Sequence, residues 1–373
     1  MIYLDYAADT PADERVLSCF CDRYRNFSAN PNSQHSMGTL AKTELDRLTK
    51  SIAALLGVLP SEIIYTSGAS EANNLALKGL AKSQRNMGKH IVSTCLEHSS
   101  VSGTLTALQE QGYEIELVDI NRDGTVDLAH LKELLRKDTV IVSVCMVDSE
   151  LGTVQPIDAI GEILTNHPNC RFHVDATQAV GKIPVHFKGV DCMSFAPHKF
   201  YGLNSCGVLI KRDGVVLEPL IHGGLSATVY RSGTPDLPMI AATETALTLA
   251  LEQLPSRHDY VSALYQTIKS KLSAYCHVTI NSPDKGTPFI LNVSIKGVKG
   301  EDFRSALDKK GVCISTKSAC SAPNTPSRPV YAISKDRKNA LSSWRISLSH
   351  LTTENEVRDF LTIFEQCYGE LTT

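Results

Sequence analysis

The sequence lacks the features that mark a membrane, secreted or nucleic-acid-binding protein. Its 373 residues hold no run of about 18 consecutive apolar residues, so a transmembrane helix is not expected. The N-terminus has no basic segment followed by an apolar one, so no signal peptide is visible. Lys and Arg number 37 against 40 Asp and Glu, and no basic run stands out. We therefore expect a cytoplasmic protein that binds neither nucleic acid nor a membrane.

Cysteine is present but lacks the spacing of a metal site or a disulfide framework. There are 11 cysteines, an odd number, and no C-x-x-C pair. We expect reduced thiols that are mostly buried and inert, and no bound metal. That expectation leaves open whether one thiol is reactive.

Short apolar runs alternate with helical patterns over the first 250 residues. We expect strands at 63–65, 90–94, 113–118, 139–144, 171–174 and 208–210, with helices at 71–77, 128–136 and 157–164 among them. This alternation predicts an α/β fold with a mostly parallel sheet flanked by helices, whose ligands gather at the carboxyl ends of the strands.

The pattern changes near residue 250. A helical stretch from about 238 to 271, broken at Pro255, precedes expected strands at 289–295, 312–314 and 345–348 and a helix at 300–310. These elements predict a smaller α+β domain. The proline-containing stretch 321–340 has the composition of a mobile surface loop.

Two charged residues follow expected strands, where such a sheet presents its ligands. Lys199 precedes a Gly turn, and a desolvated Lys can form a Schiff base, although most lysines are ordinary surface residues. Asp175 ends a hydrophobic strand and could pair with a protonated pyridine nitrogen. A helix cap is the alternative for Asp175.

Three further motifs are each open to a structural or a functional interpretation. Thr66–Glu71 joins a strand to a helix through a Gly turn, which suits either an anion site or a Ser70 helix cap. His98 could stack on a planar ring or be structural. Cys320 lies beside a cation at the start of the proline-containing stretch, where a nucleophilic thiolate would lie, or is one more inert thiol.

Taken together and in order, these motifs resemble the cysteine desulfurases, the NifS/IscS-like branch of the class V aminotransferases. The resemblance covers nearly the whole chain. Its stretches are Tyr3–Ala8, Asn30–His35, Thr66–Asn73, Glu97–His98, His173–Gln178, Ser194–Phe195, His198–Lys199, Arg231–Thr234, Ser318–Cys320 and Arg345–Leu348.

The resemblance implies a pyridoxal 5'-phosphate enzyme of fold type I that acts on L-cysteine. It implies a large cofactor-binding domain at 15–250 and a small domain, formed by 1–14 and 251–373, that carries the catalytic cysteine. Lys199 would hold the cofactor and move the Cα proton, and His98 would stack on the ring and transfer protons. The expected cofactor contacts are Ala69, Ser70, His98, Asp175, Gln178, His198, Lys199 and Thr234, with Thr234 supplied by the second subunit of a homodimer.

For the substrate, the resemblance implies that Arg345 clamps the carboxylate, with help from Asn30. Cys320 would be the nucleophile that receives the sulfur as a persulfide, and the rest of the substrate would leave as alanine. The sulfur would then pass from Cys320 to an acceptor protein. That protein could serve iron–sulfur cluster assembly, tRNA thiolation or cofactor synthesis.

The chain departs from the family pattern in its pocket. Ala196 and Pro197 replace a phosphate-binding hydroxyl and its neighbour, and Ser149 replaces an amide. Residues 225–230 also differ from the usual stretch. These departures leave open a selenocysteine lyase or another β-elimination enzyme, and a non-catalytic sulfur-relay or docking protein.

Overall fold

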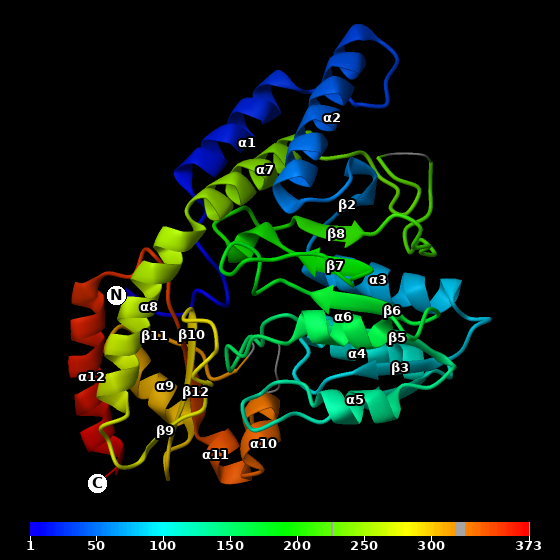
Figure 1. The fold of residues 1–373 in the computed structure, drawn as a ribbon. Coiled ribbons are helices and arrows are strands. Elements are labelled where there is room, and N and C mark those ends of the chain that lie inside the picture. Colours follow the sequence, from blue (N-terminus) through cyan, green and yellow to red (C-terminus); the bar gives the residue numbers. More distant parts are fainter. Residues whose placement is uncertain (225–226, 318–324, 373) are drawn as a thin grey trace.

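A seven-stranded sheet forms the centre of the larger part of the chain (Figure 1). The computed structural model describes residues 1–224, 227–317 and 325–372. Strand β8 is antiparallel to both of its neighbours and the other pairings are parallel, so the expected mostly parallel α/β sheet is confirmed. In spatial order the strands are β2 (Ile63–Thr66), β8 (Gly207–Lys211), β7 (Cys192–Phe195), β6 (Arg171–Asp175), β5 (Thr139–Cys145), β3 (His90–Ser93) and β4 (Glu114–Leu117).

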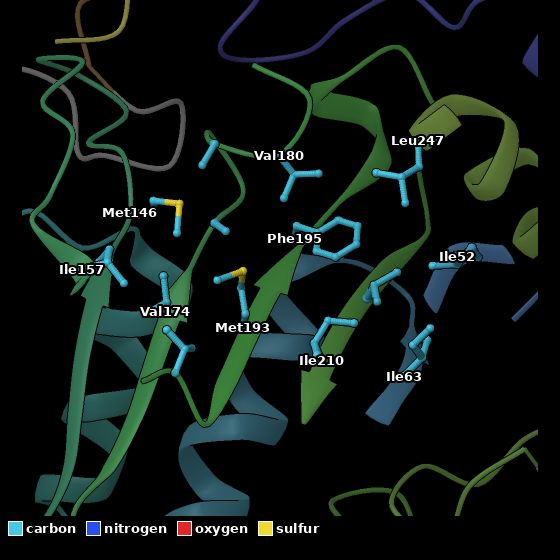
Figure 2. Packing of buried hydrophobic residues seen from close by; sticks show 14 of the residues in the cluster. Ile52, Ile63, Met146, Ile157, Val174, Val180, Met193, Phe195, Ile210 and Leu247 are labelled. Atoms are coloured by element: carbon cyan, nitrogen blue, oxygen red, sulfur yellow. The ribbon is translucent and has the colours of Figure 1, made fainter. Parts of the chain in front are cut away.

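Helices cover both faces of this sheet because its strands are apolar on both sides. Adjacent residues such as Leu209 and Ile210 point to opposite faces and belong to different hydrophobic clusters. The face with Leu209 packs against α3 (Ala69–Ser83) and α4 (Ser99–Gln109). The other face packs against α1 (Glu14–Asn26), α2 (Ser36–Leu56), α5 (Leu128–Leu134), α6 (Ile157–Leu164) and α7 (Leu237–Glu252). Figure 2 shows this second cluster, with Met193, Phe195 and Ile210 projecting from neighbouring strands.

A second core lies beside the large sheet and joins the two ends of the chain. The N-terminal strand β1 (Ile2–Tyr3) pairs with β11 (Val312–Cys313), so Ile2 and Leu4 pack among residues from the last third of the sequence. An antiparallel sheet of β12 (Ser343–Ser347), β10 (Ile290–Ile295) and β9 (Val278–Ile280) packs with α8 (Leu254–Leu272), α9 (Gly300–Lys309) and α12 (Glu354–Thr372). The domain boundaries at residues 14 and 250 stay predictions.

The proline-containing stretch is structured where the chain is described, so the expectation of a mobile loop over 321–340 is wrong for its second half. Two short helices occur there, α10 (Arg328–Ser334) and α11 (Arg337–Leu341). The Ser327 hydroxyl caps α10 by accepting from the Val330 amide, and buried Val330 and Ala340 pack on Leu151. Here a helix cap and an apolar contact outweigh the loop-like composition. Among the described residues, no helix is long and apolar enough to cross a membrane.

Candidate active site

A cavity of about 380 Å³ opens at the carboxyl ends of the parallel strands. Strands β5 and β6 end in register, with Cys145 opposite Asp175, and β7 places Ser194 opposite Asp175. The lining includes the predicted residues Ala69, Ser70, His98, Asp175, Gln178, His198, Lys199 and Arg345. The parallel topology therefore brings residues that are far apart in the sequence to one edge of the sheet.

Lys199 lies at the end of the short 3-10 helix η2 (Pro197–Lys199), directly after β7. Its Nζ donates hydrogen bonds to the carbonyls of Ala7, at 3.0 Å, and Ala8, at 2.5 Å. Burial, followed by the charge of Arg345, lowers the pKa of this amine. A lowered pKa leaves more of the amine neutral, the form that attacks an aldehyde.

Asp175 presents a carboxylate that is held from two directions. Its Oδ2 accepts from Asn73 Nδ2 at 2.8 Å, and its Oδ1 accepts from the Thr177 amide at 2.9 Å. The carboxylate is buried and lines the cavity, and a buried charge requires a partner. A protonated ring nitrogen in the cavity would be such a partner. Asn73, which sequence reasoning did not single out as a site residue, lies fully buried on α3.

His98 has the structural role that was one of its two alternatives, and it also lines the cavity. Its Nδ1 accepts from the Ser100 amide and so caps α4. Burial lowers the pKa of the ring, which favours neutral imidazole. Because Nδ1 is an acceptor, the neutral ring carries its proton on Nε2, the atom left for a ligand in the cavity.

The N-terminus of α3 lines the cavity. Gly68 is the N-cap and no side chain caps this helix, so the alternative of a Ser70 cap is wrong. The cavity is lined by Ser67 to Glu71, where first-turn amides have no partner within the helix. Gly207 of β8 packs against this turn so closely that a Cβ there would lie 2.3 Å from the Gly68 carbonyl carbon.

Gln178 and His198 also line the cavity. Gln178 Nε2 donates to the Ala7 carbonyl at 2.8 Å, and its Oε1 accepts from Lys182 Nζ at 2.7 Å. Burial, followed by the charge of Lys199, lowers the pKa of His198 to about 4. His198 is therefore neutral at pH 7 and can donate only one ring N–H to an anion.

Arg345, on β12, brings a guanidinium to the lining of the cavity. The residue is 2% exposed, and it donates to Asp5 Oδ1 and to the Ser149 carbonyl, both at 2.7 Å. Within the described chain, its Nε is buried without a hydrogen-bond partner. Asp5 is a second residue that the sequence did not single out, because its contact with Arg345 spans 340 positions.

Two predicted site residues, Thr234 and Asn30, do not line this cavity. Thr234 is exposed and lines a neighbouring cavity of about 190 Å³ that shares Ser67 with the first. Asn30 is exposed in the turn between α1 and α2, where its Oδ1 accepts from the Asn32 amide. Cys320 lies outside the described residues. Over the ranges that are described, no three His, Cys, Asp or Glu side chains gather as a possible metal site.

The donor set of the cavity fits pyridoxal phosphate. Lys199 supplies an amine for the aldehyde, Asp175 a carboxylate for the ring nitrogen, and the α3 N-terminus amides for the phosphate. The volume lies in the usual range of small-molecule sites. Ala196, where the family pattern has a hydroxyl, adds no side-chain donor to this set.

Comparisons with known proteins agree with this geometry. Residues 2–360 match the family "Aminotransferase class-V". The chain is 37% identical to a "NifS/IcsS protein homolog" of Lactobacillus delbrueckii subsp. bulgaricus, covering 99% of this chain and 97% of that protein. It is 37% identical to "Cysteine desulfurase IscS" of Pectobacterium carotovorum, covering 99% and 93%. A solved "NIFS-LIKE PROTEIN" superposes with a TM-score of 0.93 at 33% identity, covering 99% and 100%. The chain therefore belongs to the class-V aminotransferase family, whose members depend on pyridoxal phosphate, and within it to the NifS/IscS-like group.

Proposed function

We propose that this protein is a cysteine desulfurase, which converts L-cysteine to L-alanine and leaves the sulfur as a persulfide on Cys320. One observation carries the proposal. A single cavity joins an amine, a carboxylate and a helix N-terminus that suit the cofactor to a buried guanidinium that suits an amino-acid carboxylate. Full-length relatives that are named cysteine desulfurase support the choice of substrate.

Pyridoxal phosphate, when bound, supplies an electron sink next to the substrate Cα. The residues that would hold it are Lys199 at the aldehyde carbon, Asp175 at the ring nitrogen, Gln178 at the ring oxygen, His98 against the ring face, and Ala69, Ser70 and His198 at the phosphate.

Arg345 binds and orients the substrate. Asp5 and the Ser149 carbonyl hold the guanidinium in place before the substrate arrives, so little side-chain freedom is lost on binding. Because the Ser149 contact is made by its backbone, replacing the family's amide side chain leaves this contact intact.

Proton movement falls to Lys199 and His98. Lys199 Nζ takes the Cα proton, and burial favours the neutral amine that this step requires. His98 holds a proton at Nε2 and can pass it to or from the substrate, since Nδ1 is occupied by the Ser100 amide.

Cys320 receives the sulfur. Its thiolate forms an S–S bond with the substrate sulfur while the C–S bond of the substrate breaks. The electron pair of that bond stays with the carbon, which takes up a proton and becomes the methyl group of alanine. In this proposal the same sulfur must reach the buried cavity and then an acceptor.

The protein acts as a homodimer in this proposal, with Thr234 of each copy completing the phosphate site of the other. Thr234 is exposed and lines the neighbouring cavity, which suits a contact across an interface between two copies. Asn30 would assist substrate binding. A cytoplasmic sulfur-acceptor protein would take the persulfide sulfur.

The first test is the visible spectrum of the purified protein, followed by addition of L-cysteine and a thiol reductant. We expect cofactor absorption, with alanine and sulfide released in equal amounts. Absorption without sulfide would refute the desulfurase and lead to L-selenocysteine as the next substrate. No absorption after added pyridoxal phosphate would favour a non-catalytic docking protein.

Two substitutions assign the roles. Lys199→Ala should abolish the cofactor absorption, whereas the exposed Lys188→Ala should keep it. Cys320→Ala should keep the absorption and lose sulfide release, whereas the exposed Cys21→Ala should keep both. Sulfide release by the Cys320 variant would remove Cys320 from the mechanism.

A further inference from the structure

A lysine that the proposed reaction does not use contacts one of the residues that line the cavity. Lys182 is 7% exposed, and its Nζ donates to Gln178 Oε1 at 2.7 Å. Burial, followed by the charges of Lys199 and Arg345, lowers the pKa of its amine to about 7. Burying an amine near two other cations costs free energy. The presence of Lys182 at this position therefore calls for an explanation, and its contact with Gln178 offers one.

Two contacts fix which way round the Gln178 amide lies. The Lys182 amine can donate to the amide oxygen in its protonated and in its neutral form, and this is the contact that the structure shows. A backbone carbonyl only accepts, so the atom that meets Ala7 must be the amide nitrogen. Turning the amide over would place two acceptors against each other at Ala7 and would remove the hydrogen bond that Lys182 now donates to the amide oxygen.

This orientation decides what Gln178 offers to the cavity. Its oxygen is engaged by Lys182, and one of its two N–H groups is engaged by Ala7. The second N–H is left for a ligand, since Gln178 lines the cavity. Gln178 can therefore act as a donor toward the ring oxygen of the cofactor, and a donor favours the ionised oxygen over the protonated one.

The same arrangement connects to Lys199. The Ala7 carbonyl accepts from both Gln178 Nε2 and Lys199 Nζ. Lys182, Gln178, Ala7 and Lys199 thus form a continuous row of hydrogen bonds along one wall. The geometry points to Lys182 as a positioning residue that locks the Gln178 amide as a donor and so keeps the ring oxygen of the bound cofactor ionised.

The inference rests on the proposed cofactor but not on which sulfur amino acid is the substrate. Its readout is the ratio of two absorption bands of the holoenzyme without substrate, because the ionised ring oxygen absorbs at longer wavelength than the protonated one. Lys182→Met keeps the length of the side chain and removes the donor. We expect the ratio of long- to short-wavelength absorption at pH 7 to fall roughly two- to tenfold, the change expected from one lost hydrogen bond.

Two variants separate this role from general damage. Lys182→Gln restores a neutral N–H donor and should recover most of the wild-type band ratio. Lys211→Met makes the same change at another buried lysine, whose Nζ donates to the Val215 carbonyl, and should leave the ratio unchanged.

The outcomes are distinct. An unchanged band ratio in a Lys182→Met protein that still binds the cofactor would overturn the positioning role and leave the proposed function standing. The same fall in Lys211→Met would also overturn it, because the effect would not depend on Gln178. Absence of cofactor absorption in the wild-type protein would overturn the cofactor assignment and this inference with it.

Discussion

The buried amine of Lys182 should make the stability of the protein depend on pH in a way that one substitution removes. Its pKa is lowered from 10.5 to about 7. Between these values the unfolded chain binds a proton that the folded chain lacks, so wild-type stability rises with pH in this window. Below pH 7 both states are protonated, and the cost of burying the charge is full and constant.

Lys182→Met removes this contribution, so the difference between variant and wild type isolates it from every other titrating group. The variant should gain most, relative to wild type, at pH 7 and below. Over the two units from pH 7 to pH 9 its advantage should shrink by about 2–3 kcal/mol, since one pKa unit is worth about 1.4 kcal/mol.

Thermal unfolding followed by circular dichroism measures this difference. For a folding unit of roughly 150–250 residues, a change of 2–3 kcal/mol moves the midpoint by about 4–12 °C. The midpoints of variant and wild type should therefore converge from pH 7 to pH 9 and keep a constant separation from pH 5 to pH 6. A separation that does not change from pH 7 to pH 9 would refute the lowered pKa of Lys182 in the folded protein.

Three further substitutions test other parts of the structure. Gly207→Ala should weaken pyridoxal phosphate binding in a titration, because its Cβ would displace Gly68 at the phosphate site, whereas Gly103→Ala, which has open space, should not. Asp5→Asn should raise the KM for cysteine about tenfold at unchanged cofactor absorption, because Arg345 loses a charged hydrogen bond; an unchanged KM would contradict this role. Phe364→Ala should cost about 3–5 kcal/mol of unfolding free energy in a denaturant titration, because it empties the aromatic core around Trp344, and a loss below 1 kcal/mol would contradict that packing.

Much of the fold could be predicted from local pattern. The helix predicted at 157–164 has the bounds of α6. The long helical stretch, expected to break at Pro255, breaks at Gln253, and Pro255 lies in the first turn of α8. These features depend on apolar periodicity and on the missing amide of proline, which act over a few residues. The helices α10 and α11 were missed because their stability depends on packing against Leu151.

Part of the candidate site could likewise be predicted from the sequence. Lys199, Asp175 and the Thr66–Glu71 turn follow strands, so the sequence alone was enough to predict that they meet at one edge of a sheet, and together with the resemblance it predicted the cofactor. Their individual roles, and those of Cys320 and Thr234, stay predictions.

The tertiary structure decided how these residues are held. Asp5 reaches Arg345 across 340 positions, Asn73 reaches Asp175 across 102, and the Ala7 carbonyl meets both Gln178 and Lys199. Such contacts depend on how the N-terminal segment and α3 pack against the sheet, and no spacing along the chain encodes them. The sequence, together with the resemblance, was enough to predict most of the groups that line the cavity. The orientation of each group, and with it whether Gln178 donates or accepts, follows only from the packing around it.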